Sequence, residues 1–171
     1  MTFPLELEPV LHAMRQAIAQ ARLGPGAYAR WLGKERESLP GGTEVNPYGC
    51  ADAANSLYTL GDFPSELTER AAFIQVMQEM QDPATGLFQE ATHHTFHVTA
   101  HVIAALELFD ARPRHPLRGL DFLSPPMAME NFLDQLAWTT DPWSAPTREP
   151  GYLPHASSRV KLMPPGNAAT F

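Results

Sequence analysis

The sequence predicts an all-α fold built from antiparallel helical hairpin repeats, and two observations lead to this prediction. Residues 48–64 align with residues 97–113 at an offset of 49 residues, and the identical positions are Ala51/Ala100, Leu57/Leu106 and Pro64/Pro113. Each copy is followed by an amphipathic stretch that ends in Asp-Pro, at Asp82 and at Asp141. A period of this length, made of two helices and a turn, is typical of repeats that bury the apolar faces of their neighbours.

The N-terminal residues predict two helices before the first repeat. Apolar residues at helical spacing predict an amphipathic helix over about 5–23, which ends at Gly24-Pro-Gly26. A second, shorter helix, carrying Tyr28, Trp31 and Leu32, is expected to run to about Ser38. Residues 39–47 contain strong helix breakers and predict a loop.

The first repeat predicts an inner helix over about 48–61 and an outer helix after a turn at 62–65. The inner helix is small and apolar except for one polar stripe, which contains Tyr48, Asp52, Asn55, Ser56 and Thr59. The outer helix is expected to bury one face, formed by Leu67, Ala71, Ile74, Met77 and Met80. Residues 82–86, Asp-Pro-Ala-Thr-Gly, predict a tight turn.

The second repeat predicts a helix over about 95–110 and a partner helix over about 126–139. The first of these is apolar nearly all round, which is typical of a buried helix. The partner helix carries Met127, Met129, Phe132, Leu133, Leu136 and Trp138. No strand pattern competes with these helices.

The composition narrows the classes of protein to which the chain can belong. Its 171 residues suit one domain, 44% are hydrophobic, and no apolar run approaches a membrane span. We therefore expect a cytoplasmic protein without a membrane partner. The net charge of −7 argues against a nucleic-acid partner. Cys50 is the single cysteine, so neither an internal disulfide nor a cysteine-rich metal site can form.

The chain divides into a helical hairpin repeat domain over 1–143 and a tail over 144–171. The tail is interrupted by Pro146, Pro150, Pro154, Pro164 and Pro165, and no period continues into it. One hypothesis is a native irregular arm. The other is a third repeat read in the wrong frame, because one GC-rich codon choice gives a shifted peptide with an early His, paired alanines and a Leu-Thr-Gly-Glu end. The nucleotide sequence around Ser144 distinguishes the two hypotheses.

The repeat resembles a known superfamily. Inner helices of the His/Tyr-x-x-Ala-x-x-x-Ala-Ala-x-x-Leu type, with the Gln81-Asp-Pro-x-Thr-Gly-Leu-Phe88 turn, are similar to the α/α toroids over roughly residues 26–143. These include the terpenoid cyclase/protein prenyltransferase group and the six-hairpin glycosidases and polysaccharide lyases. The resemblance implies inner helices that present site residues to a central cavity. This chain holds too few hairpins to close a ring, so the resemblance implies an incomplete α/α toroid.

The resemblance does not carry over a reaction. The prenyltransferase zinc set has no clean counterpart, because Cys50 and Asp52 point to opposite sides of a helix. The Asp-rich motif of the cyclases is also missing.

Histidines at helical spacing form the strongest motif for chemistry. His97 and His101 are one turn apart, and His94 lies on the same side if the helix already includes it. Neutral imidazoles at this spacing can share a divalent metal such as Zn²⁺, with Glu90 as a further ligand or base. The alternative is that these histidines line a partly polar cavity through hydrogen bonds.

The repeat also predicts a shared polar face. Asp52 aligns with His101, and Tyr48 aligns with His97, so all four are expected to face one concavity. A carboxylate, imidazoles and a phenol could perform acid–base chemistry on a saccharide or a similar small molecule. We expect Asp52, His97 and His101 as catalytic residues, and Tyr48, Asn55 and Glu90 as substrate-binding residues. The alternative for Asp52 is a cap or pair within the helix bundle.

Two functions follow as hypotheses. The first is a truncated relative of a cavity enzyme, acting on a carbohydrate or isoprenoid-type substrate, with little activity alone. The second is a non-catalytic binding or interaction module that uses the same concave face. An array that ends after its second unit leaves an apolar side uncovered, so self-association through the last hairpin is also expected.

Overall fold

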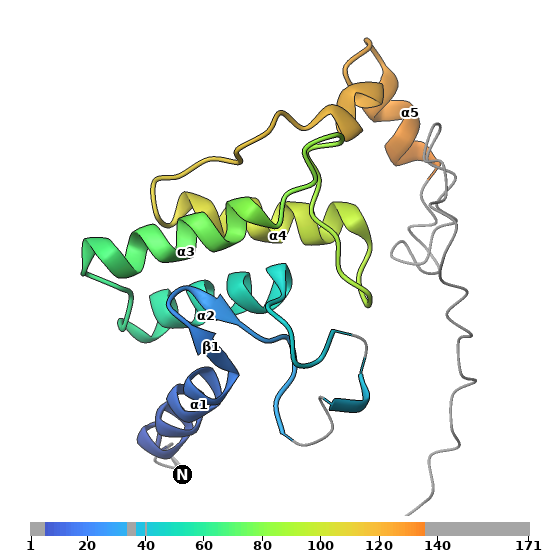
Figure 1. Ribbon diagram of the computed structural model, residues 1–171. Helices are drawn as coiled ribbons and strands as arrows, with labels where there is room; N and C mark the ends of the chain where they lie inside the picture. The colour runs from blue at the N-terminus through green and yellow to red at the C-terminus, as the bar shows by residue number, and fades with distance from the viewer. Residues whose placement is uncertain (1–5, 34–36, 40, 136–171) are drawn as a thin grey trace, which may run out of the picture.

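The computed structural model describes residues 6–33, 37–39 and 41–135, and these residues are mostly helical (Figure 1). The helices are α1 (Glu8–Ala21), α2 (Pro47–Leu60), α3 (Leu67–Glu79), α4 (Thr95–Glu107) and α5 (Ala128–Asp134), with a 3-10 helix η2 (Arg118–Leu123) before α5. One antiparallel pair joins β1 (Arg22–Gly24) to β2 (Ala27–Tyr28). The all-α prediction is confirmed at this coarse level. None of the described helices is both long and apolar enough for a membrane span.

The predicted helix that carries Tyr28, Trp31 and Leu32 is wrong. Tyr28 lies in β2, and residues 29–33, which follow it, are irregular rather than helical. The turn at Gly26, with φ of 64°, reverses the chain between β1 and β2. The backbone NH of Ala29 then donates to the Ala21 carbonyl, which ties this segment to the end of α1. These bonds replace those that a helix would make, and the short sheet was not predicted.

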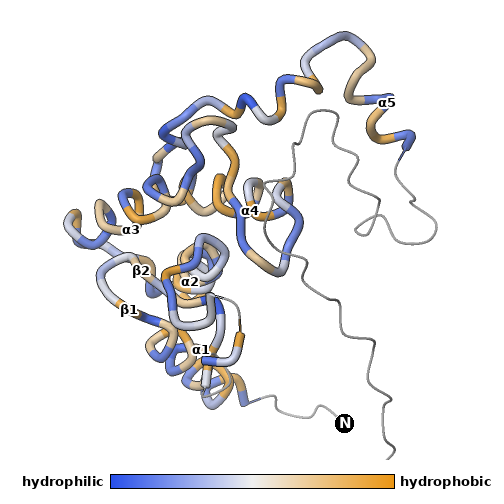
Figure 2. Tube along the Cα trace, turned by 45° about the vertical axis from the view of Figure 1, so that its right-hand side comes forward, coloured by the Kyte–Doolittle hydropathy of each residue, from blue (hydrophilic) through white to orange (hydrophobic). Residues whose placement is uncertain are grey.

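Helices α2, α3 and α4 surround the core of the described part of the chain. α2 and α4 lie side by side and run in the same direction (Figure 1). α3, which connects them in the sequence, runs in the opposite direction. α1 crosses the other side of α2 and alternates between hydrophilic and hydrophobic residues along its length (Figure 2). α2 therefore lies between α1 and α4, and one of its sides presents its polar stripe.

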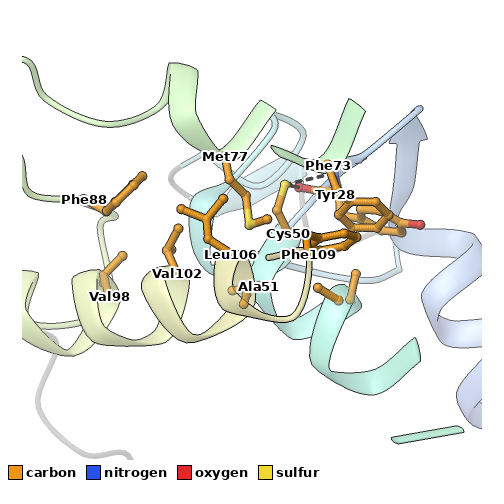
Figure 3. Close-up of a cluster of buried hydrophobic side chains, with 13 residues drawn as sticks. Tyr28, Cys50, Ala51, Phe73, Met77, Phe88, Val98, Val102, Leu106 and Phe109 are labelled. Carbon is orange, nitrogen blue, oxygen red and sulfur yellow. Dashed lines mark hydrogen bonds between the residues drawn. The ribbon is translucent and has the colours of Figure 1, made fainter. Parts of the chain in front are cut away.

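The core fills the space between α2, α3 and α4 (Figure 3). Its largest fully buried side chains are Phe73, Phe88, Met77, Leu87, Leu106, Val98, Val102 and Cys50. Small residues on α2, including Ala51 and Ala54, let α4 approach closely. The predicted buried face of the outer helix is only partly correct: Met77 is buried as predicted, but Leu67 is 81% exposed, and Phe73, which was not predicted, also enters the core.

Residues 95–135 depart most from the predicted repeat. α4 ends at Glu107, and its Ala100 and Ala104 are exposed, so this helix is not buried all round. α5 packs against η2 rather than alongside α3, held by Phe96, Phe122 and Phe132. Residues 136–139 of the predicted partner helix, and the whole tail 144–171, lie outside the described residues.

The turn predicted after α3 is confirmed. The Asp82 carboxylate accepts hydrogen bonds from the Ala84 NH and the Thr85 hydroxyl, and Gly86 takes a φ of 73°. A Cβ on Gly86 would lie 2.0 Å from the Pro116 carbonyl oxygen, so glycine is needed there for space as well as conformation.

Burial makes Cys50 a structural residue. Its side chain is fully buried beside Tyr28, and burial raises the pKa of the thiol to about 11. The folded state therefore holds the thiol proton more tightly than the unfolded chain does. We expect the free energy of unfolding to be unaffected by this group below the ordinary thiol pKa and to fall as pH rises from there towards 11. Chemical denaturation at stepped alkaline pH, with Cys50→Ala as the matched control, measures this loss; an equal loss in the variant would contradict it.

Candidate functional site

The site begins with the way α2 is capped. The Asn46 side chain accepts hydrogen bonds from the Tyr48 and Gly49 NH groups, and Pro47 occupies the first turn. This cap fixes where the helix starts and therefore which side carries Tyr48 and Asp52. One helical turn later, Asp52 lies on the same side as Tyr48.

α4 starts in a different way and presents its histidines to α2. The His94 ring accepts a hydrogen bond from the Phe96 NH, so His94 caps the helix from outside. His97 and His101 then lie on one side, with parallel rings whose centroids are 6.4 Å apart.

Asp52 joins α2 and α4 to the segment after β2. Its Oδ1 atom lies 2.9 Å from Nε2 of His101, and its Oδ2 atom accepts a 2.7 Å hydrogen bond from the Arg30 guanidinium. The Asp52 side chain is 44% exposed, whereas that of Arg30 is 17% exposed. Asp52 can therefore orient the His101 ring and neutralise a largely buried cation at the same time.

Tyr48 makes the second link between α2 and α4. Its hydroxyl lies 2.9 Å from Nε2 of His97. Its ring stacks on His93 at 4.3 Å between centroids and lies 4.4 Å from the His101 ring. The guanidinium carbon of Arg30 is 4.2 Å from the centre of the same ring, which is a cation–π contact. Tyr48 is thus the centre around which the other groups assemble.

Glu90 reaches the cluster through a histidine. Its carboxylate lies 2.7 Å from Nδ1 of His93 and accepts hydrogen bonds from the NH and hydroxyl of Thr92. The Glu90 side chain is only 2% exposed. It therefore holds the His93 ring against Tyr48.

The structure brings together most of the predicted residues. Tyr48, Asp52, His97 and His101 form one cluster, and Glu90 supports it through His93. Asn55 lies on the same stripe of α2, but its amide donates to the Ala51 carbonyl of its own helix. We define the acid–base cluster as Arg30, Tyr48, Asp52, His93, His97 and His101.

Sequence reasoning missed Arg30 and the role of His93. Arg30 lies in the segment that periodicity assigned to a helix, so its approach to α2 could not be seen. The close approach depends on Gly49, where a Cβ would lie 2.5 Å from the Ala29 carbonyl oxygen. His93 directly precedes His94 in the sequence. The pair of adjacent histidines was therefore the signal by which His93 could have been included in the predicted site.

The geometry gives no support to the predicted zinc site. Among residues 6–33, 37–39 and 41–135, no group of three His, Cys, Asp or Glu side chains is arranged to hold a metal ion. His97 and His101 each direct Nε2 to a partner on α2, and His94 caps α4. Cys50 is buried on the side of α2 away from Asp52, as its spacing predicted.

A small cavity adjoins the cluster. It has a volume of about 160 Å³ and lies between α1, α2 and the segment after β2. Arg30, Asp52 and Ser56 give it a polar side, while Ile18 and Ala53 line its apolar side. At about 30 Å³ per water molecule, it has room for roughly five waters or for part of a small ligand.

The cluster can transfer protons on two adjacent imidazoles. If Nε2 of His101 carries a proton towards Asp52, its Nδ1 atom is a base, and Asp52 stabilises the imidazolium that forms. His97, which is exposed, exchanges a hydrogen bond with a phenol that can donate or accept. The arrangement therefore holds two acid–base groups side by side at one open face.

Because comparisons with known proteins find no relative, the function has to be inferred from the chemistry of this cluster. The chain matches no family model, no curated protein and no solved structure.

Proposed function

We propose that the chain is a relative of the α/α-toroid cavity enzymes, and that the acid–base cluster acts on a hydroxylated, saccharide-like small molecule. The observation that carries this proposal is a pair of contacts between residues 49 positions apart, Tyr48 with His97 and Asp52 with His101, each at 2.9 Å. Two inner helices thus contribute equivalent positions to one polar seam, as the inner helices of such toroids do.

The chemistry of the cluster favours a hydroxylated ligand over an isoprenoid. An isoprenoid chain needs a long apolar cavity, whereas the cavity beside the cluster is small and has Arg30 and Asp52 on its wall. Imidazole, carboxylate, guanidinium and phenol groups can each exchange hydrogen bonds with hydroxyls. In this proposal His97 and His101 transfer the protons, Asp52 orients His101, and Arg30 and Tyr48 position the ligand.

Low activity is part of the proposal. A site walled by two inner helices is open to water, which weakens the electrostatic stabilisation that an enclosed site provides. Further hairpins would be needed to enclose it.

One observation favours the second function, a non-catalytic binding module on the same face. Nε2 of His97 and Nε2 of His101 both contact protein partners, so ligand hydroxyls can be bound without any proton transfer. Turnover distinguishes this function from the first.

Histidine ring resonances test the proposal. We expect NMR titration of the full chain with glucose, cellobiose and methyl glycosides to shift the His97 and His101 signals. His12 on α1 and His115, both distant in sequence from the cluster, serve as internal references. His97→Gln and His101→Gln are expected to weaken binding at least tenfold, because each removes a group that faces the ligand.

Three outcomes decide between the hypotheses. Slow release of the phenol from an aryl glycoside, lost in His97→Gln, supports the hypothesis that the chain is an enzyme. Saturable shifts without turnover support the binding module. Shifts caused by farnesol and not by any saccharide, or no shift of His97 and His101 with any probe, contradict the proposed ligand class.

A further inference from the structure

A second face of α4 lies away from α2 and forms a groove. The groove has a volume of about 370 Å³ and is lined by Phe96, Ala100, Ile103 and Ala104 of α4 and by Leu120 of η2, with Glu107 at one end. Ala100, Ala104 and Glu107 are exposed. Together with the exposed His97, which lies at the edge of this face and contacts Tyr48 of α2 through Nε2, they are spaced by three, four and three residues, which places them along one line of the helix.

This groove corresponds to an interface that the molecule already contains. Ala51 and Ala54 are fully buried on α2, where α4 packs against it, and Figure 3 shows Ala51 beside Leu106. The residues 49 positions later are Ala100 and Ile103, which line the groove on α4. α4 therefore presents towards its open side the same small apolar surface by which α2 receives a helix.

The ends of this line differ in charge. Glu107 lies at the C-terminal end of α4, and His97 lies in its first turn. A carboxylate is favoured near the N-terminus of a helix and disfavoured near the C-terminus, because of the helix dipole. An antiparallel helix would bring its own carboxylate to the favoured end.

We propose that this groove is a self-association surface, and that its occupant is α4 of a second copy of the chain, packed antiparallel about a two-fold axis. An axis at the level of residue 102 places Ala100 opposite the partner's Ala104. The same axis places His97 opposite the partner's Glu107, and the reciprocal pair forms by symmetry. Small residues at the centre allow close approach, and each carboxylate meets the N-terminal end of the other helix.

The contact goes beyond the proposed chemistry and does not depend on it. It would, however, add a carboxylate beside His97 of the acid–base cluster. One helix face is small compared with the roughly 1,600 Å² that a stable interface buries, so the dimer is expected to be weak and reversible.

Sedimentation velocity of the full chain over a range of concentrations tests the surface. We expect a monomer–dimer equilibrium that Ala104→Arg weakens at least tenfold, because the larger charged side chain cannot fit at the centre of the contact. Ala71→Arg is the matched control, since Ala71 is an exposed alanine on α3. Thermal unfolding of both variants checks that the fold is retained.

Cysteine crosslinking tests the orientation. In a Cys50→Ala background, an equimolar mixture of Ala100→Cys and Ala104→Cys chains is expected to form disulfide dimers faster than either chain alone. Equal rates in the three samples would contradict the antiparallel arrangement.

Other occupants give different results, each of which overturns the proposal. A wild-type chain that stays monomeric at every concentration excludes the second copy. A monomeric wild type whose Tm falls in Ala104→Arg shows that the chain covers its own groove. A dimer that survives Ala104→Arg but is lost in Val10→Arg assigns the contact to α1, where Leu7, Val10 and Met14 are exposed.

Discussion

Gly49→Ala is expected to destabilise the protein and to separate Arg30 from Asp52. The added Cβ would lie 2.5 Å from the Ala29 carbonyl oxygen and 2.7 Å from its carbon, and backbone atoms cannot move aside as a flexible side chain can. Such overpacking costs about 3 kcal/mol. The better helix propensity of alanine offsets about 1 kcal/mol of this cost, so the free energy of unfolding should fall by about 2 kcal/mol. Chemical denaturation measures the loss.

Gly24→Ala is the matched control for this prediction. A Cβ on Gly24 would meet only the Ala27 Cβ, at 4.0 Å, which is an ordinary contact. We expect this variant to stay within about 0.5 kcal/mol of the wild type. If the Gly49→Ala protein is as stable as the Gly24→Ala protein, the segment after β2 does not pack closely on α2 at Gly49.

Asp52→Ala is expected to be the most damaging change within the acid–base cluster. It removes the anion that neutralises Arg30, whose side chain is 17% exposed, and it removes the hydrogen-bond partner of His101. Breaking a buried ion pair costs about 3–5 kcal/mol. Because the Asp52 side chain is 44% exposed, solvent screens part of this cost, and we expect a loss of about 2 kcal/mol. The His101 ring resonances should also shift.

A double variant separates the charge from the packing. Replacing both partners, as Asp52→Ala with Arg30→Met, removes the unpaired cation and should recover part of the lost stability. Asp62→Ala is the surface control. Asp62 pairs with Arg15, and their side chains are 39% and 40% exposed, so the loss in free energy of unfolding should be much smaller. If Asp52→Ala and Asp62→Ala cost the same, Asp52 does not hold a buried cation.

Helices α1 to α4 could be predicted from the sequence because their signals are local. The helix breakers in residues 39–47 predict where α2 begins, apolar periodicity predicts α1, and a stretch that is apolar nearly all round predicts α4. The segment after α1 could not be predicted in this way. Tyr28 and Trp31 stand at helical spacing, but Gly26 reverses the chain, and the backbone of Tyr28 and Ala29 bonds to distant parts of the protein.

The candidate site was predictable to the extent that it follows the repeat. Tyr48, Asp52, His97 and His101 could be paired by their offset of 49 residues, because equivalent positions on parallel neighbouring helices lie side by side. Arg30 could not be paired, since its position depends on a close approach at Gly49 that only tertiary packing creates. The zinc prediction rested on spacing along one helix, which does not reveal that Nε2 of His101 contacts Asp52 on another.

The most direct test of the shared polar seam is the NOE pattern of the Tyr48 ring in a selectively Tyr- and His-labelled sample. If α2 and α4 lie parallel in this register, Tyr48 gives cross-peaks to the rings of His93, His97 and His101, and the last two vanish in His97→Gln and His101→Gln respectively. Cross-peaks from Tyr48 to none of the α4 histidines would show that the two helices do not share a face.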